Sequence, residues 1–128
     1  MNVLLDTKVC IDLLRGRVRG KRLPRAADCR LSTVVTAELR VGAEKSAQPA
    51  AQREAVRTLI DLLRRVPFDD EAARHYGDIR AHLESRGAPI GPLDLLIAAH
   101  ARSLGATLLT ANLGEFNRVP GLKCAAWE

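Results

Sequence analysis

Aromatic residues are scarce in this chain of 128 residues, of which phenylalanine, tyrosine and tryptophan together make up 3%. Hydrophobic residues of all kinds still make up 47%, so the core must be aliphatic. So few aromatic side chains also argue against a platform on which nucleic-acid bases stack. At this length we expect one domain spanning residues 1–128, without a linker.

The sequence also lacks paired cysteines and long apolar segments. Its three cysteines are scattered and form no CxxC motif, so we interpret them as small buried residues in a reducing compartment. No apolar run approaches the roughly 20 residues that a membrane-spanning helix needs. No charged region followed by an apolar one precedes Asp6, so we expect no secretory signal. These absences predict a soluble, cytoplasmic protein with no membrane partner.

Positive charge is in excess, with a formal net charge of +5 and a pI near 9.6. This balance favours polyanionic partners, nucleic acid first. The polar connection at residues 15–25 is the richest basic stretch, and it is either a solvated loop or a surface for RNA phosphates. The candidates for backbone contacts are Arg15, Arg17, Arg19, Lys21 and Arg22.

Short apolar runs alternate with segments of helical spacing along the whole chain. Runs at residues 3–5, 30–35, 66–68, 107–110 and 123–125 predict strands. Helices are predicted over residues 7–15, 36–45, 52–65 and 70–86, with a further helix after Gly91-Pro92. This alternation predicts an α/β protein whose parallel sheet is covered by helices on both faces.

Three acids stand where predicted strands end or helices begin. Asp6 follows the first strand, Glu38 lies in the first turn after the second, and Asp94 lies in the first turn of a late helix. The carboxyl ends of parallel strands share one edge of the sheet, so these acids can converge there. Clustered carboxylates without cysteine favour Mg²⁺ or Mn²⁺ over zinc, and water on such an ion can hydrolyse a phosphodiester. The alternative is that each acid only stabilises a helix start.

Histidine is not needed for this chemistry. The three histidines are spread over different predicted helices, and we interpret each as a surface or packing residue: His75, His82 and His100.

Four segments, in order, resemble the VapC toxins of bacterial VapBC toxin–antitoxin pairs, and the resemblance extends over essentially the whole chain. They are residues 4–7 (LLDT), 36–46 (TAELRVGAEKS), 90–101 (IGPLDLLIAAHA) and 109–122 (LTANLGEFNRVPGL), followed by Trp127. The resemblance implies a single PIN domain, with a parallel sheet of about five strands in an α/β/α sandwich. It also implies Mg²⁺- or Mn²⁺-dependent endoribonuclease activity, with 5′-phosphate and 3′-hydroxyl products.

The same resemblance implies partners. They are a VapB-type antitoxin, which binds operator DNA and covers the acidic site, and an RNA substrate, typically a structured loop of tRNA or rRNA. It also implies a homodimer, and contact with operator DNA only through the antitoxin.

Carried over residue by residue, Asp6, Glu38 and Asp94 match the metal-binding acids of the family. The fourth acidic position is either Glu115, as a weaker catalytic contributor, or the position of Asn112. The neighbouring polar residues are interpreted as supporting groups, with Thr110 orienting the acids through a hydrogen bond: Thr7, Lys8, Thr110 and Asn112.

Lys8 departs from the family, in which asparagine or a small polar residue follows the Asp-Thr pair. A lysine so near Asp6 can pair with an acid and compete with the metal, contact the scissile phosphate, or point into solvent. Our hypothesis is that it tunes metal affinity.

Two other functions are compatible with parts of the sequence. A response-regulator receiver would use acids such as Asp69 and Asp70, but no lysine after a later strand completes its set. A catalytically degenerate PIN domain that only binds the antitoxin, as a co-repressor, is favoured by Lys8 and Asn112. Metal-dependent cleavage of RNA would separate this second alternative from an enzyme.

Overall fold

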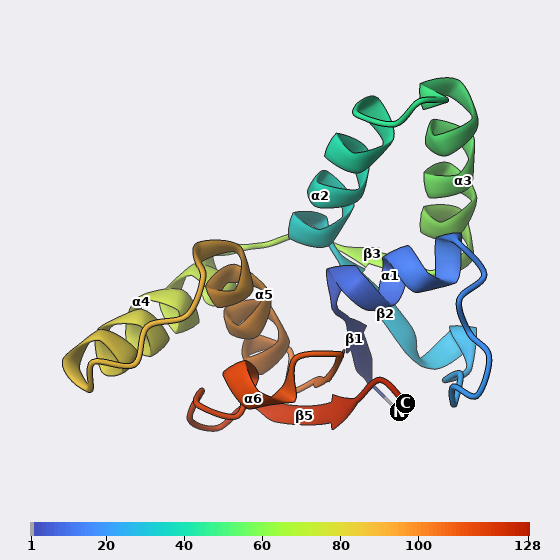
Figure 1. Ribbon diagram of the computed structural model, residues 1–128. Coiled ribbons are helices and arrows are strands. Elements are labelled where there is room, and N and C mark those ends of the chain that lie inside the picture. The colour runs from blue at the N-terminus through green and yellow to red at the C-terminus, as the bar shows by residue number, and fades with distance from the viewer. Residues whose placement is uncertain (1) are drawn as a thin grey trace.

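The computed structural model describes residues 2–128 and has the expected α/β/α architecture (Figure 1). Its strands are β1 (Val3–Leu5), β2 (Cys29–Ser32), β3 (Arg64–Val66), β4 (Thr107–Thr110) and β5 (Lys123–Ala126). Its α-helices are α1 (Thr7–Leu14), α2 (Thr33–Glu44), α3 (Pro49–Leu62), α4 (Asp70–Ser85), α5 (Pro92–Ser103) and α6 (Leu113–Phe116), and a 3₁₀ turn η1 (Ala26–Asp28) precedes β2.

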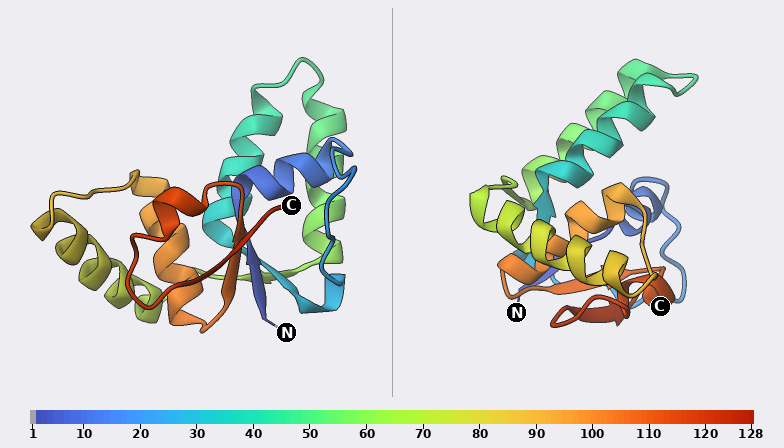
Figure 2. Two further views of the ribbon diagram at one scale, coloured as in Figure 1. Left: turned by 60° about the horizontal axis from the view of Figure 1, so that its bottom comes forward. Right: turned by 90° about the vertical axis from the view of Figure 1, so that its left-hand side faces the viewer.

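The five strands form one parallel sheet in the order β3-β2-β1-β4-β5, which confirms the predicted sheet. Val3 of β1 pairs with Cys29 on one side and with Thr107 on the other. The chain winds outward from β1 to β3 and then returns to β4 beside β1. Because such crossovers are right-handed, α1 to α3 cover one face and α4 to α6 the other. The α2–α3 hairpin projects from the sheet in every view (Figures 1 and 2).

The core is aliphatic, as the composition predicts. Leu4, Leu31 and Leu108 of the central strands are fully buried, and the helices add residues such as Val35 and Ile97. Phe116 and Trp127 are the buried aromatic residues near the C-terminus. No helix within residues 2–128 is long and apolar enough to cross a membrane.

Several predicted boundaries are wrong by a few residues. The second strand ends at Ser32 rather than at residue 35, because the Ser32 Oγ accepts a hydrogen bond from Val34 N (3.1 Å) and starts α2 there. The valines that follow resemble a strand locally, although they pack on the inner side of a helix. Helix α3 begins at Pro49 and not at residue 52, because proline suits the first turn of a helix, where its missing N–H is not needed.

Candidate active site

The carboxyl ends of β1 and β4 adjoin at the centre of the sheet. The chain leaves β1 into α1 on one face and leaves β4 toward α6 on the other, so the neighbouring connections diverge. Such a divergence opens the crevice in which parallel sheets bind ligands. Asp6 and Thr110 stand on its two sides, as the positions of the predicted strands indicate.

Asp6 is held by a hydrogen bond to each of its carboxylate oxygens. It is the N-cap of α1, and its Oδ1 accepts from Thr7 N (2.8 Å). Its Oδ2 accepts from the Thr110 hydroxyl (2.7 Å), and only 6% of the residue is exposed. Asp6 is therefore both a helix cap and an oriented acid, because a simple cap would need only the first of these bonds. The hydrogen bond expected of Thr110 is present.

Glu38 reaches the same site from α2. Because α2 begins at Thr33, Glu38 lies in the second turn of the helix and not in the first, which corrects the predicted position. The Thr7 hydroxyl donates to Glu38 Oε1 (2.9 Å), so this carboxylate is linked to the start of α1. Thr7 thus contacts both Asp6 and Glu38, while Thr110 joins Asp6 to the end of β4.

Asp94 lies in the first turn of α5, as predicted, and is partly buried. Its pKa is raised to about 7, first by burial, then by a hydrogen bond to Glu115 and by the negative charges of Glu115, Asp6 and Glu38. This dependence links all four carboxylates in one electrostatic cluster. At neutral pH the cluster retains a proton that isolated carboxyl groups would have lost.

Glu115 belongs to α6, a helix of one turn that the sequence analysis did not predict. Its Oε1 accepts from Gly91 N (3.2 Å) and its Oε2 from Asn112 Nδ2 (3.0 Å). Burial pushes the pKa of Glu115 upward, but these hydrogen bonds and the one from Asp94 outweigh it and leave that pKa lowered. The two candidates for the fourth acidic position are therefore in contact, and Asn112 holds the Glu115 carboxylate in place.

Lys8 does not pair with Asp6. Its Nζ donates to Asp12 Oδ1 (2.8 Å), one turn farther along α1, and the other oxygen of Asp12 accepts from Trp127 Nε1 (2.9 Å). Asp12 was not predicted as a partner of Lys8, although its spacing of four residues from Lys8 is that of an ion pair on one helix face. The contact with Trp127 spans 115 residues and leaves no local signal.

The basic connection at residues 15–25 runs from the end of α1 to η1, before the amino end of β2. Most of it therefore lies away from the acids, which gather at the carboxyl ends of the strands. Arg15 lines a groove with Glu38, but Lys21 is bound to the C-terminus, since its Nζ donates to Trp127 O (3.1 Å) and lies 5.4 Å from the centre of the indole ring. The side chains of the remaining candidates, Arg17, Arg19 and Arg22, are exposed.

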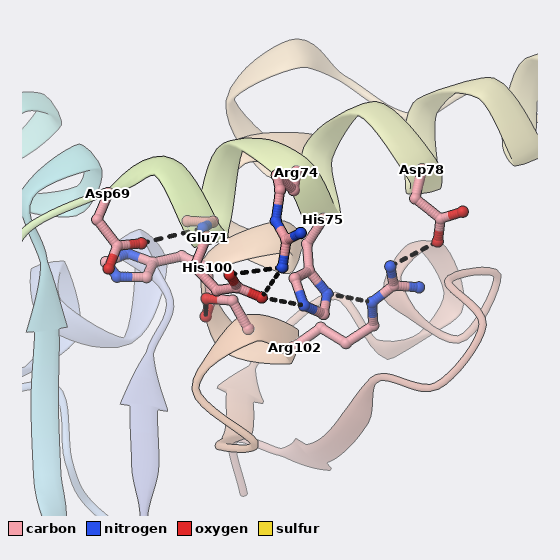
Figure 3. A network of polar contacts seen from close by, with 9 residues as sticks. Asp69, Glu71, Arg74, His75, Asp78, His100 and Arg102 are labelled. Atoms are coloured by element: carbon pink, nitrogen blue, oxygen red, sulfur yellow. Dashed lines mark hydrogen bonds and ion pairs between the residues drawn. The ribbon is translucent and has the colours of Figure 1, made fainter.

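The contacts of His75 and His100 support the packing interpretation (Figure 3). His75 Nδ1 accepts from Arg102 Nε (2.8 Å), and the same arginine donates to Asp78 (2.6 Å). His100 is buried, and its Nδ1 lies 2.8 Å from the Ser32 hydroxyl. Asp69, considered above for a receiver domain, caps α4 by accepting from Ala72 N (3.0 Å).

The residues at the site fit a hard cation by their chemistry. All the charged donors are carboxylates, and the nearby Cys10 is a poor ligand because burial, and then the charges of Asp6 and Cys29, raise its thiol pKa. As they lie, no three Asp, Glu, His or Cys side chains within residues 2–128 stand close enough to hold a metal ion. Burial contributes most to the raised pKa of Asp94, and the charges of Glu115, Asp6 and Glu38 add to it, because carboxylates without a counter-charge repel one another.

Comparison with known proteins extends the resemblance to the whole chain. The family model described as PIN domain matches residues 3–122. A relative from Shigella flexneri, named tRNA(fMet)-specific endonuclease VapC, is 37% identical over 132 residues, which cover 100% of this chain and 99% of the relative. A solved structure of DNA-bound VapBC from Salmonella typhimurium contains a chain with a TM-score of 0.89 and 36% identity, covering 100% of this chain and 99% of that one.

A second solved structure, VapBC2 from Rickettsia felis bound to a DNA fragment from their promoter, gives a TM-score of 0.88 at 29% identity, with 100% of both chains covered. Sequence and fold therefore agree over the full length. The chain belongs to the PIN-domain family and, within it, to the VapC ribonucleases of toxin–antitoxin systems.

Proposed function

We propose that this chain is a metal-dependent endoribonuclease in which Asp6, Glu38 and Asp94 bind Mg²⁺ or Mn²⁺, with Glu115 as a supporting acid. The observation that carries the proposal is the gathering of four carboxylates, from the starts of α1 and α5 and from α2 and α6, at the carboxyl ends of the strands. Burial first, and then the hydrogen bond to Glu115 and the charges of the other acids, raise the pKa of Asp94 to about 7. A divalent cation is the natural counter-charge for such a cluster.

Each residue has a distinct part in this proposal. Thr110 and the Thr7 amide hold the Asp6 carboxylate in one orientation, while the Thr7 hydroxyl holds Glu38. Asp94 would have to lose its proton to hold a cation, so metal and proton would compete for this group. A bound Mg²⁺ would supply an acidified water molecule and charge stabilisation for phosphodiester hydrolysis, leaving 5′-phosphate and 3′-hydroxyl ends.

For the substrate, we propose a structured loop of tRNA or rRNA. Initiator tRNA is the first candidate, since the similar protein from Shigella flexneri is named as specific for tRNA(fMet). Recognition would rest on the shape of the loop and on phosphate contacts, because the chain offers few aromatic side chains for stacking.

We further propose that the chain forms a homodimer and binds a VapB-type antitoxin, and reaches operator DNA only through that antitoxin. The structural likeness to VapBC complexes, two of which are DNA-bound, supports this assembly. A basic antitoxin side chain inserted among the four acids would neutralise them and compete with the metal.

The test is cleavage of tRNA(fMet) and of total cellular RNA by the purified, antitoxin-free protein with Mg²⁺, Mn²⁺ or EDTA. Asp94→Asn is the matched inactive variant. Discrete cuts that need the metal and vanish in the variant are expected. The alternative is a catalytically degenerate module that acts only as a co-repressor; a folded protein that binds its antitoxin but cuts neither RNA under any metal would establish it.

A further inference from the structure

Asp12 is a buried carboxylate whose two oxygens are both taken by donors. Only 6% of the residue is exposed; Oδ1 accepts from Lys8 Nζ and Oδ2 from Trp127 Nε1. The hydrogen bond from Lys8, and then that from Trp127, lower the pKa of Asp12, so it is ionised at neutral pH. A charge buried this deeply persists only where such donors compensate its lost hydration.

Trp127 connects this carboxylate to the candidate active site. Its backbone N donates to Thr110 O (2.8 Å), and the Thr110 hydroxyl donates to Asp6 Oδ2 (2.7 Å). Trp127 is itself buried and bound by Lys21. A continuous series of bonds therefore runs from Asp6 through Thr110 and Trp127 to Asp12, and the position of Asp12 is set by the same strand end that orients Asp6.

Lys8 needs such a partner because of where it lies. It follows Asp6 by two residues in the first turn of α1. Its side chain is 53% exposed, so without a partner its ammonium could reorient. Without Asp12, an ammonium on the first turn of α1 could turn toward the acids at the start of that helix, of which Asp6 is only two residues away. Asp12 lies six residues beyond Asp6, about 9 Å along the helix axis, and draws the ammonium away from the cluster.

We propose that Asp12, fixed by Trp127, is a positioning residue that holds the Lys8 ammonium away from the metal-binding carboxylates. The inference rests on the proposed function, since it concerns competition between Lys8 and the cation.

A double-mutant cycle tests this, with Mn²⁺ binding to the antitoxin-free protein measured by calorimetry at about 0.15 M salt, where distant charges are screened. Asp12→Asn keeps the shape and can still accept from Trp127, but frees Lys8. We expect it to weaken Mn²⁺ binding roughly tenfold, and the added Lys8→Asn change to restore binding to within about twofold. Lys8→Asn alone should change binding by less than about twofold, because the ammonium is already held away.

Additive effects of the two changes would overturn the inference, since they would mean that each charge acts on the site independently. Asp12→Asn with unaltered Mn²⁺ affinity would overturn it as well. Asp12→Glu, which keeps the charge, should bind Mn²⁺ like the unchanged protein. Should Asp12→Asn not fold, the exposed Lys8→Asn change alone still decides: a several-fold gain in affinity would show that Lys8 already competes with the ion.

The proposed function fails by a different result. If the unchanged protein binds Mn²⁺ no better than Asp94→Asn, there is no metal site for Lys8 to disturb. If the unchanged protein binds Mn²⁺ and Asp12→Asn does so equally well, the metal site stands and only the positioning role is lost.

Discussion

The Thr110 hydroxyl makes two hydrogen bonds at the end of β4, donating to Asp6 Oδ2 (2.7 Å) and accepting from Asn112 N (2.9 Å). Thr110→Val removes both while keeping the shape of the side chain. We expect a loss of about 1–3 kcal/mol in the free energy of unfolding, because the buried Asp6 Oδ2 is left without a donor. Metal-dependent cleavage should fall roughly tenfold as Asp6 loses its fixed orientation.

Urea unfolding and cleavage rates measure the two effects, and Thr110→Ser is the matched control, since it keeps the hydroxyl. Equal stability and equal cleavage in the valine and serine variants would contradict the role of this hydroxyl.

The raised pKa of Asp94 makes the stability of the metal-free protein depend on pH. A carboxyl whose folded pKa lies above its unfolded value contributes stability that is present below the unfolded value, 3.8, and is lost as the pH rises through about 7. Asp94→Asn escapes this loss. In EDTA at about pH 8 we expect the variant to be more stable by about 1–2 kcal/mol, a figure discounted for the partial exposure of the site.

Thermal melting between about pH 5 and pH 8 measures this difference. The gap in melting temperature between the variant and the unchanged protein should widen as the pH rises, by a few degrees in all. If the difference in melting temperature stays constant with pH, the pKa of Asp94 is not raised in the folded protein.

At the scale of elements, the pair α4–α5 is joined by the Arg102 side chain, of which 15% is exposed (Figure 3). It donates to His75 and Asp78 on α4 and to Pro120 O (3.0 Å) before β5. Arg102→Met keeps most of the apolar stem but removes every donor. We expect it to lower the free energy of unfolding by about 1–3 kcal/mol, as for loss of buried hydrogen bonds to a charged group.

Asp78→Ala is the matched control, because it breaks one of these contacts at a side chain that is 70% exposed. Its effect on urea unfolding should stay within about 0.5 kcal/mol. An Arg102→Met variant as stable as the control would show that apolar packing alone holds the helix pair.

At the scale of the whole molecule, the four acids and the basic connection at residues 15–25 lie toward opposite ends of the parallel strands. The four acids gather at the carboxyl ends of the strands, while the connection at residues 15–25 leads to the amino end of β2. An RNA substrate would have to extend from one end of the strands to the other to contact both the acids and the basic connection.

We expect the double charge reversal Arg17→Glu and Arg19→Glu to weaken RNA binding and to flatten its dependence on salt concentration, by roughly 1.4 in the slope if both arginines contact phosphates of a single strand. Binding is measured over a salt series in EDTA, which should prevent the proposed metal-dependent cleavage. Arg74→Glu with Arg80→Glu on α4 changes the net charge equally and serves as the control. If RNA binding depends equally on salt concentration in the two double variants, the weaker binding results from the change in net charge alone.

Much of the site was predictable because its signals are local. Asp6 and Asp94 stand at helix starts, where a capping residue or a Gly-Pro turn marks the position within a few residues. The parallel sheet follows from the alternation of strands and helices, but the order of its strands was not predicted, because right-handed crossovers are compatible with several orders. The exact turn of Glu38 was missed, because two β-branched valines after Ser32 resemble a strand until the serine caps the helix.

The sequence by itself determined the aliphatic core, the parallel α/β fold and the set of acids, since periodicity and residue type act over a few neighbouring residues. Only the tertiary structure decided which partners these side chains take. Glu115 depends on Gly91 and Asn112, Thr110 reaches Asp6 across 104 residues, and Asp12 meets Trp127 across 115. The contacts of Thr110 and Trp127 arise when β4 pairs with β1 and β5 pairs with β4, and hydrogen bonds between residues so distant leave no pattern in the chain.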